Sequence, residues 1–326
     1  MNSIFRWLCV VRNWNRSTKK RKEMTMHRRD LLKLGTVAAA SAALTPLSSA
    51  AGISASNVTV RWLGGAMLEL RIGDIRVLTD PCLGDGTEAF EMGDPNEMFD
   101  LSTGPNIKMH ERLTPFPGMA MREYDVVLLS HAHEDHFDQK AQAWLGANGP
   151  VLCSVQDVNA LTKKGFAAQA LIHGENRAFR RGDTKDSITS IPAVHSLNTG
   201  ISDILGLGNG YWLQATIRGK TSHIYWAGDT FMADPVQAAV QQFPAPDMLI
   251  PHIGAVGTNG TLGQLSMTGH QAVEFAERLK AGLILPVHHS TYALYQEPVS
   301  KMIEAHAISG IPSALNVLRE GSALTL

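Results

Sequence analysis

The chain has 326 residues, of which 44% are hydrophobic and 18% charged, enough to bury one large core and to form one domain rather than two. The net charge of −1 conceals an asymmetry. Residues 1–33 carry ten Lys and Arg against two Asp and Glu (+8), and residues 51–326 carry 19 against 28 (−9). Because phosphate binding needs a net positive surface, the acidic body argues against nucleic acid as a partner.

The basic N-terminus resembles a twin-arginine (Tat) signal peptide. Arg28-Arg29 precedes an apolar stretch from Leu34 to Leu47, and Ser48-Ser49-Ala50 has the small residues of a cleavage site. The apolar stretch is shorter than the ~20 residues that span a bilayer. We therefore expect residues 1–50 to be a Tat-type signal peptide with an extended N-terminus, the Tat export machinery to be a partner, and the mature protein to be periplasmic or otherwise exported. The alternative is a chance arginine pair before an Ala-rich helix.

Short β-rich runs begin the body of the chain. They cover residues 58–63, 66–72 and 75–78, and the glycines between them predict antiparallel strands. Residues 84–118 show no period and predict a long loop with room for a helical turn; loops of this length are often lids. The apolar residues of this loop either form a lid for an acyl chain or pack as in any long loop: Phe90, Met92, Met98, Phe99 and Met109.

Further along, predicted strands alternate with predicted helices. The strands are expected at 125–130, 151–155, 187–195, 211–217, 223–227, 248–251 and 283–287. The helices are expected at 138–145, before Lys163, and at 235–242, 268–280 and 298–307. This alternation predicts an α/β fold for residues 56–326, a four-layer αβ/βα sandwich with helices outside two sheets. Cys82 and Cys153 are expected to be small buried side chains rather than a disulfide.

One stretch, His131-Ala132-His133-Glu134-Asp135-His136, places three imidazoles and two carboxylates directly after a buried strand. Imidazole nitrogen and carboxylate oxygen suit Zn²⁺, and also Mn²⁺ or Fe²⁺. The i, i+2 spacing lets His131 and His133 face one metal, while Asp135 and His136 can turn to a second. The stretch therefore predicts a metal site.

Three further candidate ligands each stand where a predicted strand ends: His195, Asp229 and His288. Together with the clustered residues they complete a site for two metals. His252 also follows a strand and is a candidate for the acid that protonates the leaving group; a structural role is the alternative. His289, beside a ligand, is a weaker candidate for that role. The remaining histidines are expected to be structural or exposed: His110, His173, His223, His270 and His306.

Asp80, the 131–136 run, His195, Asp229 and His288 resemble the five successive motifs of the metallo-β-lactamase superfamily. The resemblance implies one metal on His131, His133 and His195 and a second on Asp135, His136 and His288. It implies that Asp229 bridges both metals and that Asp80 steers a ligand imidazole. Asp135 and His252 are the candidate catalytic residues.

Within that superfamily the chain resembles the N-acyl-phosphatidylethanolamine phospholipase D-like and L-ascorbate-6-phosphate lactonase-like group. The supporting segments are 78–81, 112–115, 129–131, 227–230 and 288–294. The last segment departs from the group at His289 and Ser290, where Trp and Gly are usual. True β-lactamases lack a bridging Asp, so Asp229 argues against antibiotic hydrolysis.

Two cations about 3.5–4 Å apart can share a bridging hydroxide and polarise the oxygen that gains negative charge. The expected function is therefore metal-dependent hydrolysis with two divalent ions, zinc first, of a phosphodiester in an N-acyl phospholipid-like substrate. A lactonase or carboxylic ester hydrolase with the same ligands is the alternative, and a non-catalytic metal-binding protein is another. The expected partner is a small-molecule or lipid substrate, with peripheral membrane contact in the lipid case. The oligomeric state stays open.

Overall fold

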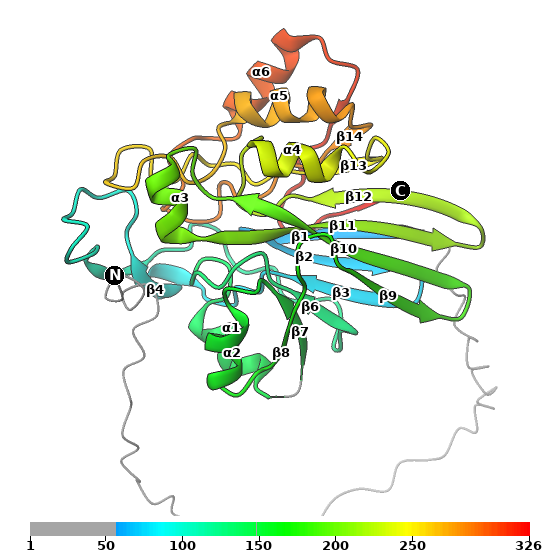
Figure 1. Ribbon diagram of the computed structural model, residues 1–326, viewed down its shortest axis with the longest axis horizontal. Helices are drawn as coiled ribbons and strands as arrows, with labels where there is room; N and C mark the ends of the chain where they lie inside the picture. Colours follow the sequence, from blue (N-terminus) through cyan, green and yellow to red (C-terminus); the bar gives the residue numbers. More distant parts are fainter. Residues whose placement is uncertain (1–56, 148) are drawn as a thin grey trace, which may run out of the picture. The chain divides into compact units, whose positions relative to one another are not determined.

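Two seven-stranded mixed sheets lie face to face in the computed structural model, which describes residues 57–326 except residue 148 (Figure 1). The first sheet has the order β16 (Ala323–Thr325), β1 (Val58–Gly64), β2 (Met67–Ile72), β3 (Ile75–Thr79), β6 (Val126–Leu128), β7 (Pro150–Cys153) and β8 (Ala167–Ala170). The second has the order β15 (Ala314–Leu315), β14 (Leu283–Ile284), β13 (Met248–Ile250), β12 (Lys220–Trp226), β11 (Leu207–Ile217), β10 (Thr184–Val194) and β9 (Asn176–Arg181).

Helices cover the outer face of each sheet. On the first sheet they are α1 (Gln139–Leu145) and α2 (Val158–Lys163). On the second they are α4 (Asp234–Val240), α5 (Gly269–Leu279) and α6 (Ser300–Ser309). This arrangement confirms the predicted four-layer sandwich. The signal-peptide prediction lies outside the described residues and stays a prediction.

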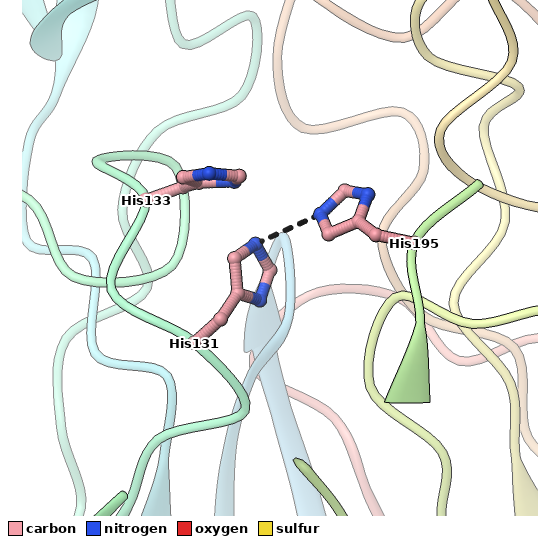
Figure 2. Close-up of side chains that lie close together, drawn as sticks. All are labelled: His131, His133 and His195. Atoms are coloured by element: carbon pink, nitrogen blue, oxygen red, sulfur yellow. Dashed lines mark hydrogen bonds between the residues drawn. The ribbon is translucent and has the colours of Figure 1, made fainter. Parts of the chain in front are cut away.

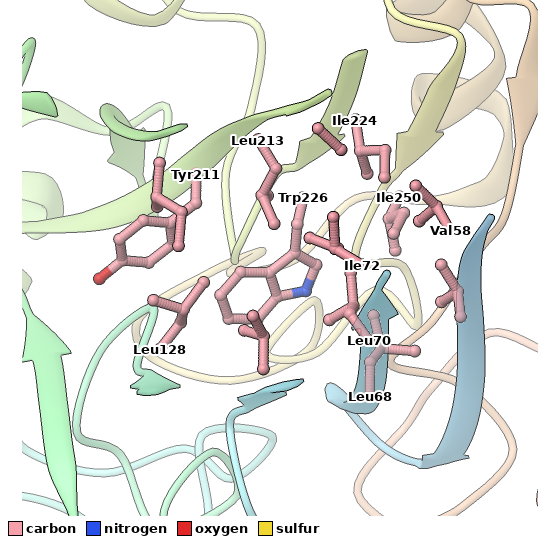
Figure 3. Close-up of a cluster of buried hydrophobic side chains, with 14 of the residues drawn as sticks. Val58, Leu68, Leu70, Ile72, Leu128, Tyr211, Leu213, Ile224, Trp226 and Ile250 are labelled. Carbon is pink, nitrogen blue, oxygen red and sulfur yellow. The ribbon is translucent and has the colours of Figure 1, made fainter. Parts of the chain in front are cut away.

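The central strands are apolar on both faces because each face is covered. In β12, Ile224 and Trp226 enter the core between the sheets (Figure 3). Tyr225 points the other way and packs under the outer helices. In β6, Val126 and Leu128 face the same core and Val127 faces α1 and α2. Strands buried on both faces read as continuous apolar runs, which is why these segments were recognisable in the sequence.

Polar residues define where the helices begin. Asp138 caps α1, and its carboxylate accepts a hydrogen bond from the Ala141 backbone N–H at 2.6 Å. Thr268 caps α5 in a capping box with Gln271. The α5 residues Val273 and Phe275 then pack against the second sheet. Both helix starts lie where the sequence predicted them.

Some elements were not predicted. Strands β8 and β9 lie at sheet edges. The sequence of β9, Asn-Arg-Ala-Phe-Arg-Arg, is rich in charged residues, as suits an exposed edge, and so it lacks the apolar pattern by which buried strands are recognised. The short helix α3 (Thr199–Leu205) and the terminal strands β15 and β16 were also missed. The segment 84–118 contains the helical turn that was expected there, the 3₁₀ turn η2 (Gly86–Glu88). It also contains two strands that were not predicted, β4 (Phe90–Gly93) and β5 (Ile107–His110), which pair with each other.

Cys82 and Cys153 are buried and free, as predicted. Among the described residues, none of the helices combines the length and apolar character needed to cross a membrane.

Candidate metal centre

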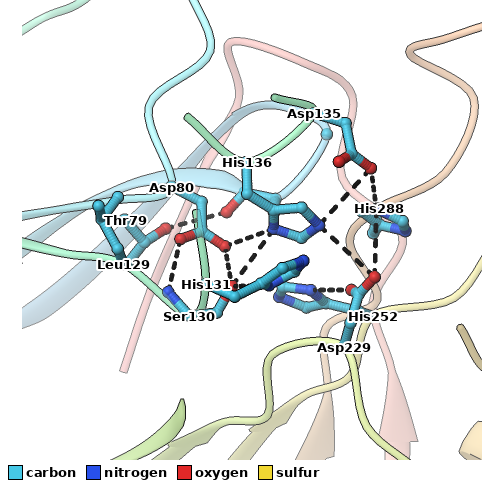
Figure 4. Close-up of polar contacts among 12 residues, drawn as sticks. Thr79, Asp80, Leu129, Ser130, His131, Asp135, His136, Asp229, His252 and His288 are labelled. Carbon is cyan, nitrogen blue, oxygen red and sulfur yellow. Dashed lines mark hydrogen bonds and ion pairs between the residues drawn. The ribbon is translucent and has the colours of Figure 1, made fainter. Parts of the chain in front are cut away.

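All the predicted metal-binding side chains stand just beyond strand ends. The 131–136 stretch follows β6, and Asp80 follows its parallel neighbour β3 in the first sheet. His195, Asp229 and His288 follow β10, β12 and β14 of the second sheet. The two sheets therefore present these residues at one edge of the sandwich, where their side chains meet (Figure 2 and Figure 4).

His131, His133 and His195 form the first group of candidate ligands. One ring nitrogen from each lies within 4.8 Å of the other two, and the three rings turn toward a common space (Figure 2). The Nε2 atoms of His131 and His195 are 3.1 Å apart. Two nitrogens at ordinary bond length from one tetrahedral zinc ion are about 3.3 Å apart, so this spacing suits shared coordination.

Asp135, His136 and His288 form the second group. The Asp135 Oδ2 atom lies 3.7 Å from His136 Nε2 and 3.5 Å from His288 Nε2. These separations are longer than ordinary hydrogen bonds. They leave room for an ion among the three donor atoms.

Asp229 lies between the two groups. Its Oδ2 atom is 3.7 Å from His195 Nε2 of the first group, and 3.5 and 3.8 Å from the Nε2 atoms of His136 and His288. One carboxylate oxygen is thus within reach of nitrogens from both groups. The structure brings all seven predicted ligands into one cluster.

The unpaired ring nitrogens of this cluster fit a metal. His136 Nε2 and His288 Nε2 are buried and have no hydrogen-bond partner among the described residues. Their Nδ1 atoms are engaged, His136 by Asp80 at 2.7 Å and His288 by the Ile253 carbonyl at 2.8 Å. A neutral imidazole that donates its Nδ1–H in this way offers the Nε2 lone pair to an ion.

The two ligand groups differ in their ionisation. Burial lowers the pKa of His131 well below its usual value and that of His133 to about 4, so both rings are neutral. Burial alone would raise the pKa of Asp229, but His288 and His136 outweigh it and hold this carboxyl well below its usual range. Burial would also lower the pKa of His136 and of His288, but the Asp229 carboxylate outweighs it and raises both. A metal ion that binds at their Nε2 atoms would therefore displace a proton from each ring.

Backbone geometry at the site is unusual at two of these positions. Asp80 has φ 33° and His288 has φ 61°, in the left-handed region that side chains other than glycine rarely occupy. Gly228, just before Asp229, has φ 67°, and a Cβ there would lie 2.7 Å from the Asn209 carbonyl oxygen. Only glycine fits the turn that delivers Asp229.

Asp80 and Ser130 support the cluster from behind. Asp80 accepts hydrogen bonds from the Ser130 backbone N–H at 2.8 Å, the Ser130 hydroxyl at 2.5 Å and His136 Nδ1 at 2.7 Å. This is the position that the resemblance implied for Asp80. Ser130 was not singled out by sequence, because a serine next to a histidine carries no signal of its own.

We predict that Asp80→Ala weakens metal binding about 10- to 100-fold, because His136 loses the acceptor that orients it. Competition with a chromogenic chelator would measure the affinity, with Asp203→Ala, an exposed aspartate on α3, as the matched control. Unchanged affinity in Asp80→Ala would show that His136 needs no such support.

His252 lies at the base of the cluster. It is fully buried, and its Nδ1 atom lies 2.8 Å from Asp229 Oδ1. Burial lowers its pKa to about 4, so the ring is neutral and donates its Nδ1–H to the carboxylate. His252 does not line the adjacent cavity. This placement favours positioning of Asp229 over the predicted role of leaving-group acid.

The other histidines within residues 57–326 lie outside the cluster. His289 is buried beside the Trp62 ring and contacts the Ser290 hydroxyl at 2.9 Å. The remaining ones make local contacts with Met92, Gly208, Asp247, Glu274 and Ser313: His110, His173, His223, His270 and His306 respectively.

A cavity adjoins the candidate ligands His133, Asp135, His195 and Asp229. Of the five apolar loop residues considered for a lid, Met92 lines this cavity. Phe90 is buried in the packing of the loop, whereas Met98 is 78% exposed. The fold and this site define a metal-dependent hydrolase of the metallo-β-lactamase class.

Comparison with known proteins gives the family. The model of the Beta-lactamase superfamily domain matches residues 75–289, and the chain belongs to this superfamily. A UPF0173 metal-dependent hydrolase of Hyperthermus butylicus is 24% identical over 236 residues, which cover 72% of this chain and 84% of that protein. Another from Listeria monocytogenes is 26% identical over 262 residues, covering 79% of this chain and 96% of that protein.

Solved structures share the fold. The isothiocyanate hydrolase from Delia radicum gut bacteria superposes with a TM-score of 0.65 at 20% identity, covering 82% of this chain and 98% of that one. A possible metal-dependent hydrolase from Veillonella parvula gives a TM-score of 0.67 at 18% identity, covering 83% and 100%. The narrower grouping with the phospholipase D-like and lactonase-like proteins stays a prediction.

Proposed function

We propose that this chain hydrolyses its substrate with two divalent metal ions. His131, His133 and His195 would hold one ion, Asp135, His136 and His288 the other, and Asp229 would bind both. The observation that carries this proposal is the position of Asp229 Oδ2, within 3.8 Å of imidazole nitrogens from both groups. The nitrogen and oxygen donors suit zinc, with Mn²⁺ and Fe²⁺ as alternatives.

When bound, such ions lower the pKa of water to near neutrality and polarise the substrate oxygen that gains charge. Other residues of the chain orient the metal-binding side chains. Asp80 and the Ile253 carbonyl fix the tautomers of His136 and His288, and His252 orients Asp229. Apolar walls around the adjoining cavity limit access of bulk water.

The cavity favours catalysis over passive metal storage, since it gives a substrate access to the side chains of both ligand groups. The phosphodiester expectation rests on the segment 288–294 and on the apolar loop. The lactone or ester alternative uses the same ligands.

Turnover by the full chain, freed of metal by a chelator and then reloaded with zinc, tests the proposal. We expect hydrolysis of at least one substrate in a panel of phosphodiesters, esters and lactones, lost on chelation and restored by metal. A fully loaded protein that hydrolyses none of them would contradict it.

His252→Phe separates the two roles considered for His252. Phenylalanine keeps the flat ring against His136 and His288, which stack with His252 at 5.7 and 5.5 Å, but it removes the donor to Asp229. We expect metal affinity to fall about 10- to 100-fold, as for other groups that orient a ligand. Full metal content with a low kcat would instead support the predicted proton-donor role.

We also propose export and contact with a lipid surface. The leader supports export, and a reporter fused after residue 50 tests it by reaching the periplasm only when Arg28-Arg29 is intact. Exposed apolar side chains of the segment 84–118 support the lipid contact, among them Met98 and, about 45% exposed, Ile107 and Met109. Sedimentation with neutral phospholipid vesicles tests it, and no co-sedimentation would contradict it.

A further inference from the structure

The cavity beside the candidate ligands is apolar on every other side. Apart from the ligands, its lining is formed by the segment 84–118, by Leu205 of α3 and by the segment that follows β13. The residues are Met92, Gly93, Pro95, Pro105, Leu205, Val256, Leu262 and Leu265. Asp135 and Asp229, both candidate metal ligands, are the charged side chains among the lining residues of the described chain. The cavity volume of about 40 Å³ has room for roughly three water-sized groups.

A second, larger cavity of about 260 Å³ adjoins the first. Leu262 lines both cavities, so the two cavities meet at this residue. Ser196, which follows the ligand His195, and Phe231, two residues beyond Asp229, also line the second cavity. Its other polar side chains are Asn198, Thr261 and Gln264, so within the described chain its lining is polar but uncharged.

The cationic side chains Lys108 and Arg112 of the segment 84–118 are paired with carboxylates outside the cavities. Arg112 is 3% exposed and binds Glu320 at 2.6 Å, and Lys108 contacts Asp94 and Glu97. An anionic group outside the metal position would therefore meet apolar side chains without a compensating cation. Burying an unpaired charge in such surroundings costs several kcal/mol.

We propose that the site accepts uncharged esters and lactones, with a short acyl part in the apolar cavity and a neutral hydrogen-bonding part beyond Leu262. This inference rests on the hydrolase function proposed above and narrows its substrate class. Water adds to the carbonyl carbon, the bond from that carbon to the ester oxygen breaks, and the leaving oxygen takes a proton. An ester gives a carboxylic acid and an alcohol, and a lactone gives a single hydroxy acid.

Two esters that differ in the group at the end of the acyl chain, a methyl group in one and a carboxylate in the other, test the proposal on the zinc-loaded full chain. p-Nitrophenyl butyrate and p-nitrophenyl hemisuccinate have acyl chains of equal length, and the second ends in a carboxylate that is ionised at pH 7. We expect kcat/KM for the butyrate to exceed that for the hemisuccinate by at least about 100-fold, while bis(p-nitrophenyl) phosphate, assayed beside them, tests the phosphodiester expectation.

An arginine at position 262, where the two cavities meet, should reduce the preference for the uncharged ester. Leu262→Arg is expected to raise the hemisuccinate-to-butyrate ratio of kcat/KM at least about 10-fold, because it pairs the buried carboxylate. Leu101→Arg places the same side chain on an exposed turn and should leave the ratio unchanged.

The outcomes separate the two proposals. Comparable kcat/KM for the butyrate and the hemisuccinate in the wild-type chain would overturn the uncharged-substrate inference and leave metal-dependent hydrolysis standing. A protein that holds its metals and turns over none of these substrates, nor any lactone, would contradict the hydrolase function itself.

Discussion

Asp229→Ala is expected to remove at least one of two metal equivalents and to lower kcat/KM at least about 1,000-fold. The reason is geometric, because one oxygen of this carboxylate lies near nitrogens of both ligand groups. Loss of a metal removes several kcal/mol of transition-state stabilisation. Elemental analysis and turnover, measured on the same preparation, check both effects.

Matched variants make this result specific. His133→Ala lies in the first ligand group and should also lose metal and activity, whereas Asp203→Ala on the surface of α3 should lose neither. If Asp229→Ala retained two metals with wild-type affinity, Asp229 would not join the two sites.

Asp186→Asn is expected to stabilise the protein above pH 7 by on the order of 4 kcal/mol. Asp186 lies on β10 and is 2% exposed, and within the described chain no side chain donates a hydrogen bond to its carboxylate and no ion pair includes it. Burial raises its pKa to about 7 from the usual 3.8. An asparagine of the same shape removes the buried charge without opening a cavity.

The direction of the pH dependence follows from these values. Between pH 4 and 7 the unfolded chain has released the Asp186 proton while the folded chain still holds it, so this residue lowers stability as pH rises. The stability difference between Asp186→Asn and wild type should therefore be small near pH 4 and reach its maximum above pH 7. Denaturant unfolding at several pH values measures it, with exposed Asp203→Asn as control. A difference that does not vary with pH would contradict a buried, titrating Asp186.

The ligands could be predicted from sequence because their signal is local. His131, His133 and His136 lie within six residues directly after an apolar strand, and His195, Asp229 and His288 each follow a strand of their own. The end of a buried strand is recognisable without knowledge of its neighbours. The layer architecture follows from the same alternation of strands and helices.

The remaining features depend on which strands are neighbours, and sequence does not encode that locally. β12 and β13 are parallel neighbours with Trp226 beside Ile250. Asp229 and His252 lie a few residues beyond the ends of these two strands and therefore come into contact. Without knowledge of that pairing, the sequence fits His252 as the acid that protonates the leaving group as well as it fits His252 as a residue that positions Asp229. The pairing of β4 with β5 spans an aperiodic segment and was missed for the same reason.

Metal stoichiometry of the zinc-loaded full chain is the most direct measurement of the central claim. We expect elemental analysis to find two ions per chain, and anomalous diffraction to place one among His131, His133 and His195 and the other among Asp135, His136 and His288, with Asp229 at both. A chain that binds no transition metal under any loading condition, or binds it away from these residues, would contradict it.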